Sequence, residues 1–393
     1  MQLLQTTTKN RIESIDLLKG LVIVIMAIDH VRDYFHYSSY FFDPTDPALT
    51  TSSIFFTRFI TNFCAPAFSF LAGLSAYIVG KRKTKAALSG FLLKRGLWLV
   101  FVELVIMNFG WCFDITFRTV GFQVIWILGV SMIFLAGLIH LPKKVILIFS
   151  CVLIFGHNLL DNIHFDNSIL WAFLHERKAF LTTPDHVFRV GYSIIPWVAV
   201  MSLGYCIGSF YDKTFDPIKR RKLFNTIGIA AIILFVLLRA INIYGNLLPW
   251  KDYGNLKQTI FSFLNLTKYP PSLSFLLVTL GGAFLFLANS EKIKGKIVNF
   301  FCVFGRVPFF FYIIHIYLIH FLALLTAEFT GFGWQKMILP ALPFRVDALK
   351  GFGFNLIAVY LIWIFIIVLL YPLCKKFDNY KQAHKEKWWL SYL

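Results

Sequence analysis

Charged and histidine side chains crowd the end of the first apolar segment of the chain. The segment "IDLLKGLVIVIMAIDHVRDYFH" (residues 15–36) has Lys19 before its apolar run and His30 just after it. An α-helix turns about 100° per residue, so these two side chains share one face, roughly 16 Å apart along the helix axis. A histidine shielded from water is suited to act as a general base or a nucleophile. The spacing predicts a reaction centre with His30 as the base and Asp33 orienting its ring.

A stripe of charge continues along the same predicted helix. Asp29, Arg32, Asp33 and His36 recur at intervals of three and four residues, which places them on one side of a helix. Ionisable groups inside a membrane are costly and usually mark a functional site. We therefore predict catalytic roles for His30, Asp33 and His36, and substrate contacts for Lys19, Asp29, Arg32 and Arg58. The competing interpretation is a helix end whose charges are simply solvated.

A second cluster lies in "FGRVPFFFYIIHIYLIH" (residues 304–320). We predict that Arg306, Tyr312, His315 and His320 contact substrate, with Arg306 near the middle of its membrane span. A guanidinium group binds phosphate or carboxylate through two parallel hydrogen bonds. The alternative is that Arg306 pairs with a buried acid such as Glu103 in the third span.

Other chemical motifs are missing from the sequence. It contains no P-loop, no H-E-x-x-H, no dinucleotide-binding fingerprint and no G-x-S-x-G elbow around a serine. The 6 cysteines are scattered singly, mostly within apolar runs. We expect them to be small buried hydrophobic residues. The sequence predicts no metal site and no permanently bound cofactor.

The elements that position these residues are membrane helices. The chain has 393 residues, of which 58% are apolar and only 15% charged. Charged residues usually make up about a quarter of a globular chain, and the apolar runs are long enough to cross a bilayer. The net charge of +18 is carried by short basic clusters between apolar runs. That distribution indicates membrane topology rather than nucleic-acid binding.

The pattern predicts a single all-α domain, residues 1–393, built as a bundle of about ten transmembrane helices. Basic residues are about twice as frequent in one set of connecting segments as in the other, which predicts cytoplasmic N- and C-termini. The longest outside segment, residues 161–188, is predicted to form an interfacial helix or a lid. The predicted location is the inner (cytoplasmic) membrane, in contact with lipids. The predicted spans are 15–36, 54–80, 92–112, 122–141, 144–160, 189–211, 222–246, 270–289, 297–325 and 352–373.

Four stretches together resemble the bacterial branch of the heparan-alpha-glucosaminide N-acetyltransferase catalytic-domain family. They are "RIESIDLLKGLVIVIMAIDH", "APAFSFLAG", "KYPPSL" and "FGRVPFFFYIIHIYLIH". The chain is similar, more distantly, to the wider transmembrane acyltransferase group, whose first helix carries a basic residue, ten residues and then a histidine. Lys19 and His30 occupy those positions, with lysine in place of the usual arginine.

The resemblance implies an acyltransferase. An acetyl or short acyl group would pass from cytoplasmic acetyl-CoA or another acyl-CoA, which is a co-substrate, to an acceptor on the far side. The expected acceptor is a glycan or an amino sugar, modified at an amine or a hydroxyl. The active histidine is either His30 or His36, and the possibility of a homodimer is left open. The alternative function is a transporter or flippase for a small polar or lipid-linked molecule, in which the same buried charges line a path.

Overall fold

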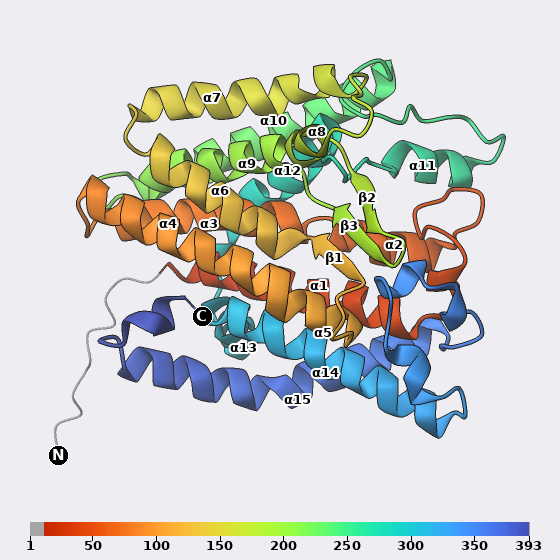
Figure 1. Cartoon of the computed structure of the whole chain (residues 1–393). Helices are drawn as coiled ribbons and strands as arrows, with labels where there is room; N and C mark the ends of the chain where they lie inside the picture. The colour runs from red at the N-terminus through yellow and green to blue at the C-terminus, as the bar shows by residue number, and fades with distance from the viewer. Residues whose placement is uncertain (1–11, 393) are drawn as a thin grey trace.

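The computed structural model describes residues 12–392 and is built mainly from long helices that run side by side (Figure 1). The helices are α1 (Glu13–Phe35), α2 (Ser52–Thr61), α3 (Cys64–Gly80), α4 (Lys85–Phe101), α5 (Asn108–Cys112), α6 (Val124–Leu138), α7 (Lys143–Gly156), α8 (Ile169–Leu174), α9 (Ile194–Ile207), α10 (Pro217–Ile241), α11 (Leu256–Leu264), α12 (Leu273–Ser290), α13 (Lys296–Arg306), α14 (Pro308–Phe329) and α15 (Leu356–Ala383). The strands are β1 (Thr119–Phe122), β2 (Lys178–Thr183) and β3 (His186–Val190).

Seven helical segments within residues 12–392 are long and apolar enough to cross a membrane. They are Ser52–Gly80, Lys143–Leu160, Ile194–Tyr211, Pro217–Ile241, Leu273–Ser290, Pro308–Phe329 and Leu356–Ala383. The other three predicted spans also fold as helices, namely α1, α4 with α5, and α6. They fall outside these limits because α1 carries several charged residues, whereas α4 has only 17 residues and α6 only 15. A multi-pass helical membrane protein is confirmed, and the number of ten crossings stays a prediction.

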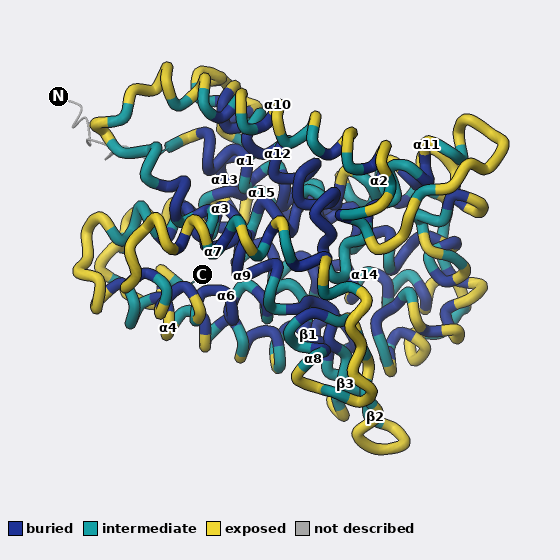
Figure 2. Tube along the Cα trace, turned by 90° about the horizontal axis from the view of Figure 1, so that it is seen from above, coloured by how far each residue is buried: buried dark blue, intermediate teal, exposed yellow. Residues whose placement is uncertain are grey.

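Helix α1 runs through the interior of the bundle, where it packs against α3, α13, α14 and α15. Most of its residues are buried, and Figure 2 shows dark blue along its trace. Its closest approach is to α13, because Gly20 and Gly305 face each other's backbone with no side chain between. Since a buried charge needs a partner, the polar residues of α1 must be paired by neighbouring elements.

A small sheet was not predicted, so the all-α class needs correction. Strand β3 pairs in parallel with β1 and antiparallel with β2, giving the order β1-β3-β2. Strands β2 and β3 and the short helix α8 come from the segment 161–188, for which a helix or lid was predicted. The predicted span 189–211 accordingly begins as strand, and its helix starts only at Ile194. The sequence of β2, "KAFLTT", has no alternation of apolar and polar residues that would distinguish it from a loop.

The predicted single span 297–325 is broken into two helices. Helix α13 ends at Arg306, and α14 begins at Pro308, the first position of a helix, where a missing N–H costs nothing. Gly305 contacts the backbone of Asp16 and Gly20 near the start of α1. Arg306 therefore lies toward that end of the bundle, and its mid-membrane position stays a prediction.

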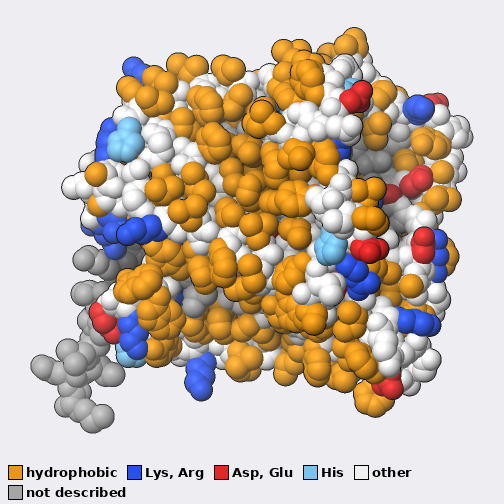
Figure 3. Space-filling model, viewed as in Figure 1, with side chains coloured by type: hydrophobic (Ala, Val, Ile, Leu, Met, Phe, Trp, Pro, Cys, Tyr) orange, Lys and Arg blue, Asp and Glu red, His pale blue; other side chains and the backbone are white. Residues whose placement is uncertain are grey.

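The two ends of the bundle differ in charge. We call the end with the connections 81–84, 212–216 and 291–295 the basic end, and the end with the sheet and the connection 41–51 the sheet end. Figure 3 shows an apolar band between the two ends, Lys and Arg gathered at the basic end, and both signs of charge at the sheet end. Helix α1 starts and α15 finishes at the basic end (Figure 1). The arrangement fits the predicted topology, although which end is cytoplasmic stays a prediction.

Candidate active site

Two histidines from distant parts of the chain meet in the interior of the bundle. Nδ1 of His30 in α1 lies 2.7 Å from Nε2 of His315 in α14. Nδ1 of His315 lies 3.0 Å from the carbonyl oxygen of Phe311, so it must carry a proton and donate. In the neutral pair, His315 Nε2 then accepts a hydrogen bond from His30 Nδ1–H. This assignment, which follows from the hydrogen bonds, leaves a lone pair on His30 Nε2.

Aromatic rings fix the orientation of the two imidazoles. Trp111 of α5 meets the His30 ring edge to face, with centroids 4.9 Å apart. The Phe311 ring stacks on His315 with centroids 4.8 Å apart and planes 9° apart. Tyr312 lies beside both histidines, 6.1 Å from the His30 centroid and 5.5 Å from that of His315. A base held in one orientation by packing is pre-organised for proton transfer.

His30 borders a cavity of about 430 Å³ that lies toward the sheet end. Polar and apolar groups share its lining, and it contains charges of both signs. The basic lining residues are Arg32, Arg58, Arg177, Lys268 and Arg345, and the acidic ones are Asp29, Asp33 and Asp43. This sheet-end cavity is large enough for a small polar ligand.

The predicted charged stripe of α1 forms an ion network in the wall of this cavity. Asp29 pairs with Arg32 Nη1 at 2.8 Å and with Arg58, and it accepts a hydrogen bond from Thr61 Oγ1 at 2.9 Å. Arg32 also pairs with Asp33 at 2.9 Å. Asp33 is thus engaged by Arg32, and the ring partner of His30 is His315. The prediction that Asp33 orients His30 is wrong, because the neighbouring guanidinium competes for the carboxylate.

Cations surround a half-buried phenol in the lining of the sheet-end cavity. The Arg177 guanidinium lies 4.4 Å from the Tyr269 ring centroid, and Lys268 Nζ lies 5.5 Å from it. Burial raises the pKa of the Tyr269 phenol, but Lys268, Arg58 and Arg177 outweigh burial and lower this pKa to about 8. This part of the cavity therefore favours negative charge.

A second cavity, of about 270 Å³, lies toward the basic end. It is mostly apolar, and its basic lining residues are Lys19, Arg95, Arg306 and Lys381. Lys19 Nζ donates to Ser75 Oγ at 2.7 Å. Arg306 Nε pairs with Asp378 Oδ2 of α15 at 2.7 Å. A buried acid for Arg306 was one of the two predicted possibilities, but the acid is Asp378. Glu103 instead accepts the N–H groups of Ile125 and Trp126 at the start of α6.

The two cavities share four lining residues. They are Met26, Phe68, Val124 and Tyr312. Met26 lies one helical turn before His30, and Tyr312 lies beside it. The two cavities therefore approach each other next to the histidine pair.

Three predicted histidines, His36, His315 and His320, lie outside both cavity linings, although His315 contacts His30. His36 Nδ1 lies 2.7 Å from Ser38 Oγ, and its ring stacks on Tyr37. His320 bonds the carbonyl oxygens of Gly110 and Met337 at 2.9 and 2.7 Å. Its ring holds α14 to α5 and to the loop after α14, and the contact of His320 with substrate stays a prediction.

Several cavity residues were not predicted, because their position depends on long-range packing. Trp111, Arg177, Lys268, Tyr269 and Arg345 come from four separate connections or helix ends. Part of this convergence could be read from the sequence, since the predicted topology places the basic residues of "LHERK" and "KYPPS" on the same side of the membrane. Nothing in their spacing indicates that they converge on His30.

A comparison with family models finds one match, over residues 11–244, to the model described as heparan-alpha-glucosaminide N-acetyltransferase, catalytic. The chain belongs to this family. The predicted resemblance is thereby confirmed, and membership indicates a membrane-embedded transferase of the acyltransferase type. No curated protein gives a significant match. The region matched to the N-acetyltransferase family contains His30 and its ion network, whereas His315, Tyr312 and Arg306 follow it.

Proposed function

We propose that this protein transfers an acetyl or other short acyl group from acyl-CoA at the basic end to an acceptor in the sheet-end cavity. The observation that carries the proposal is the pair of cavities that share four lining residues beside His30. In this arrangement the basic end is cytoplasmic. The acceptor is an extracytoplasmic sugar amine or hydroxyl. Membership of the N-acetyltransferase family favours this reaction over the alternative of transport.

The basic-end cavity suits the thioester arm of the donor. Its lining is mainly apolar, as an alkyl and amide chain requires, and it includes four basic residues. The exposed basic side chains of loop 81–84 also lie at the basic end and would attract the CoA phosphates. The distance along α1 from Lys19 to His30 is about 16 Å, which an extended pantetheine arm can cover. Arg306 also lines this cavity, where its guanidinium is paired with the carboxylate of Asp378.

The histidine pair supplies the base. His30 Nε2 accepts the proton of the attacking amine or hydroxyl while the acceptor forms a bond to the thioester carbonyl carbon. The carbon–sulfur bond then breaks, and the leaving thiolate takes the proton from the His30 imidazolium. His315 receives the Nδ1–H hydrogen bond of His30 throughout, which keeps Nε2 on the reacting side. The competing order, in which Nε2 first carries the acyl group, uses the same nitrogen.

The decisive experiment compares two histidine variants. Purified protein is incubated with acetyl-CoA and a panel of amino sugars and glycan fragments, and released CoA thiol is measured. His30→Ala should reduce transfer by about 10²–10⁴-fold, the usual contribution of a general base, while acetyl-CoA binding is kept. His36→Ala should reduce it far less, because His36 lies outside both cavity linings.

Inactive His36→Ala together with active His30→Ala would assign the base to His36 and overturn this mechanism. Failure of the wild-type protein to release CoA with any acceptor, combined with uptake of labelled sugar into vesicles, would favour the transporter.

A further inference from the structure

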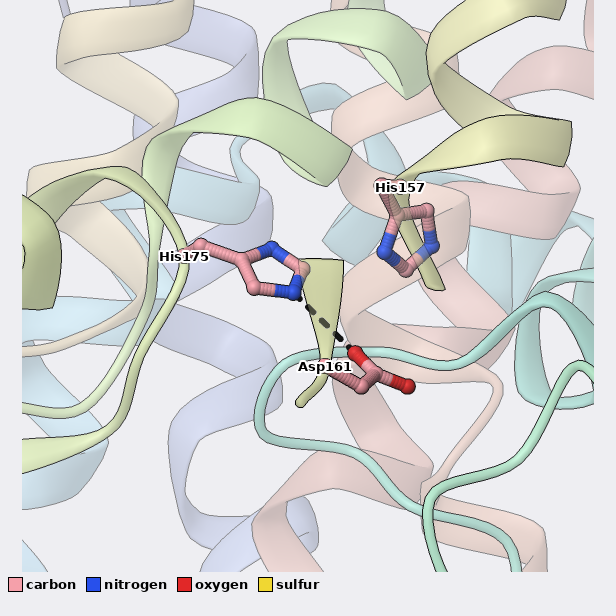
Figure 4. Close-up of side chains that lie close together, drawn as sticks. All are labelled: His157, Asp161 and His175. Atoms are coloured by element: carbon pink, nitrogen blue, oxygen red, sulfur yellow. Dashed lines mark hydrogen bonds and ion pairs between the residues drawn. The ribbon is translucent and has the colours of Figure 1, made fainter. Parts of the chain in front are cut away.

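Three potential metal ligands meet at the sheet end, away from the histidine pair. His157 and Asp161 lie just after α7, and His175 directly follows α8. One potential ligand atom from each residue lies within 4.8 Å of the other two. Figure 4 shows the His157 ring opposite the hydrogen-bonded pair of His175 and Asp161, with a ring nitrogen on the side of that pair. None of the three lines either cavity of the candidate active site.

Hydrogen bonding does not account for this cluster. The His157 side chain is buried, with 2% of its surface exposed, and neither of its ring nitrogens has a hydrogen-bond partner within residues 12–392. His175 Nε2 contacts Asp161 Oδ1 at 3.0 Å, but its Nδ1 also lacks a partner in the described chain. Buried polar atoms are normally paired. A buried imidazole with two unpartnered nitrogens beside a second imidazole and a carboxylate therefore points to a missing ligand.

We propose that His157, Asp161 and His175 bind a divalent transition-metal ion, with zinc as the best match. Two imidazoles and one carboxylate form a common three-residue zinc ligand set, which leaves a fourth position for water. Ligand atoms around zinc lie about 3.4 Å apart, as tetrahedral geometry with bonds of about 2.1 Å requires. Small side-chain rotations from the observed spacing reach that value. Magnesium and calcium prefer sets made of oxygen atoms alone.

A neighbouring residue already holds the carboxylate in place. Asn158 Nδ2 donates to Asp161 Oδ2 at 2.7 Å, which leaves Oδ1 on the side of the histidines. Asn158 Oδ1 in turn accepts the backbone N–H of Leu273 at 2.8 Å, at the start of α12. Such outer contacts orient the ligands of metal sites and tune their affinity.

The metal would link two parts of the sheet end. His157 and Asp161 belong to the end of α7, whereas His175 belongs to the segment that leads into β2. Arg177 is only two residues past His175, and its guanidinium lies over Tyr269 in the lining of the sheet-end cavity. The bound ion would thus hold this segment, and Arg177 with it, against the bundle. This anchoring of the segment does not depend on the proposed reaction.

The test measures zinc binding directly. Purified full-length protein in detergent is stripped with a chelator, incubated with zinc sulfate and desalted. Metal content is then measured by mass spectrometry, and affinity by competition with a fluorescent zinc chelator. We expect one zinc ion per chain. His157→Ala and Asp161→Asn should each weaken the affinity by about 100-fold or more, since even second-shell changes cost 10–100-fold.

His164→Ala is the matched control. His164 belongs to the same segment, but its side chain is exposed and bonds Glu176 at 3.1 Å. This variant should keep the wild-type affinity. Zinc, but not magnesium, should also raise the melting temperature of the stripped wild-type protein. This measurement uses only the wild type, so it does not depend on whether a variant folds. Zinc content no higher in the wild type than in Asp161→Asn, or absence of any zinc-dependent melting shift, would overturn the proposal.

Discussion

The chemistry available to His30 depends on which of its nitrogens carries the proton. Two hydrogen bonds in series decide this, one from His315 Nδ1 to the Phe311 carbonyl and one between His315 Nε2 and His30 Nδ1. Because each link has one donor and one acceptor, the arrangement leaves only one tautomer for a neutral pair. A histidine in this role is more commonly oriented by a carboxylate. Here the nearby carboxylates Asp29 and Asp33 are both engaged with arginines.

His315 is accordingly a positioning residue, which gives a prediction. His315→Ala should lower the rate of acyl transfer by about 10–100-fold, less than loss of the base itself, and should shift the pH–rate profile. KM for the acceptor should change little. Rates are measured across pH for the wild type, His315→Ala and the control Tyr317→Phe. Tyr317 lies on the same helix and bonds the Ile106 carbonyl outside both cavities. A pH profile identical to that of the wild type would remove His315 from the mechanism.

The Tyr269 phenol gives a pH-dependent prediction. Its pKa is about 8 in the folded protein, against an ordinary value of 10.0. A lowered acid pKa means that the fold stabilises the phenolate. The phenolate therefore adds to the stability of the folded protein above pH 10, and this added stability is lost as pH falls through 8. The melting temperature of the wild type relative to Tyr269→Phe should therefore rise between pH 8 and pH 10. Tyr253→Phe, which changes an exposed tyrosine, should show no such difference. A difference that is constant with pH would show that the phenol is not ionised.

At the scale of elements, the site depends on how closely α1 approaches α13. A side chain at Gly305 would overlap the carbonyl oxygen of Asp16, and one at Gly20 would overlap that of Phe301. Two backbones can pack this closely only when small residues separate them. Because α14 follows α13 after one residue, the same contact sets the height at which His315 faces His30.

Gly305→Ala should therefore disturb both stability and activity. The added methyl group should cost about 1–3 kcal/mol, as overpacking usually does, and should lower acyl transfer because the two histidines lose their alignment. Gly90→Ala is the control, since a methyl group there meets no atom within 4 Å in the described structure. It should be neutral or slightly stabilising, because alanine favours helix by about 1 kcal/mol. Melting curves and transfer rates of both variants check this. Equal behaviour of the two variants would contradict the packing argument.

The sequence predicted elements better than their contacts. Long apolar runs have a strong helical and membrane signal, so α10 and α12 lie close to their predicted positions, whereas α15 continues ten residues past the predicted end of its span. Local signals also placed His30 and Lys19 on one face of α1. The pairing of His30 with His315, and of Arg306 with Asp378, joins residues far apart in the chain. Spacing within one helix carries no information on such contacts. The three-stranded sheet was not predicted because each strand has only four to six residues.

At the scale of the whole molecule, the charge difference between the two ends gives a topology prediction. Single cysteines are introduced at Lys83, at the basic end, and at Asp347, at the sheet end, where the side chain is 89% exposed. A membrane-impermeant maleimide added to intact cells should label Asp347→Cys, whereas Lys83→Cys should react only after permeabilisation. The wild type is the control, because its cysteines are buried or half-buried. The opposite labelling pattern would reverse the orientation.

The four side chains shared by the two cavities also have an electrical consequence. If aqueous solution fills both cavities, the membrane voltage falls mainly across the thin layer that these four side chains form between the cavities, instead of across the whole bilayer. A charge that crossed it would exchange about 2.3 kcal/mol per 100 mV with the field. An acyl group is neutral, so its passage through the layer costs nothing in that field, while the phosphates of CoA and any charge on the acceptor stay on their own sides. The layer formed by Met26, Phe68, Val124 and Tyr312 would then let the acyl group cross the membrane without opening a path for ions.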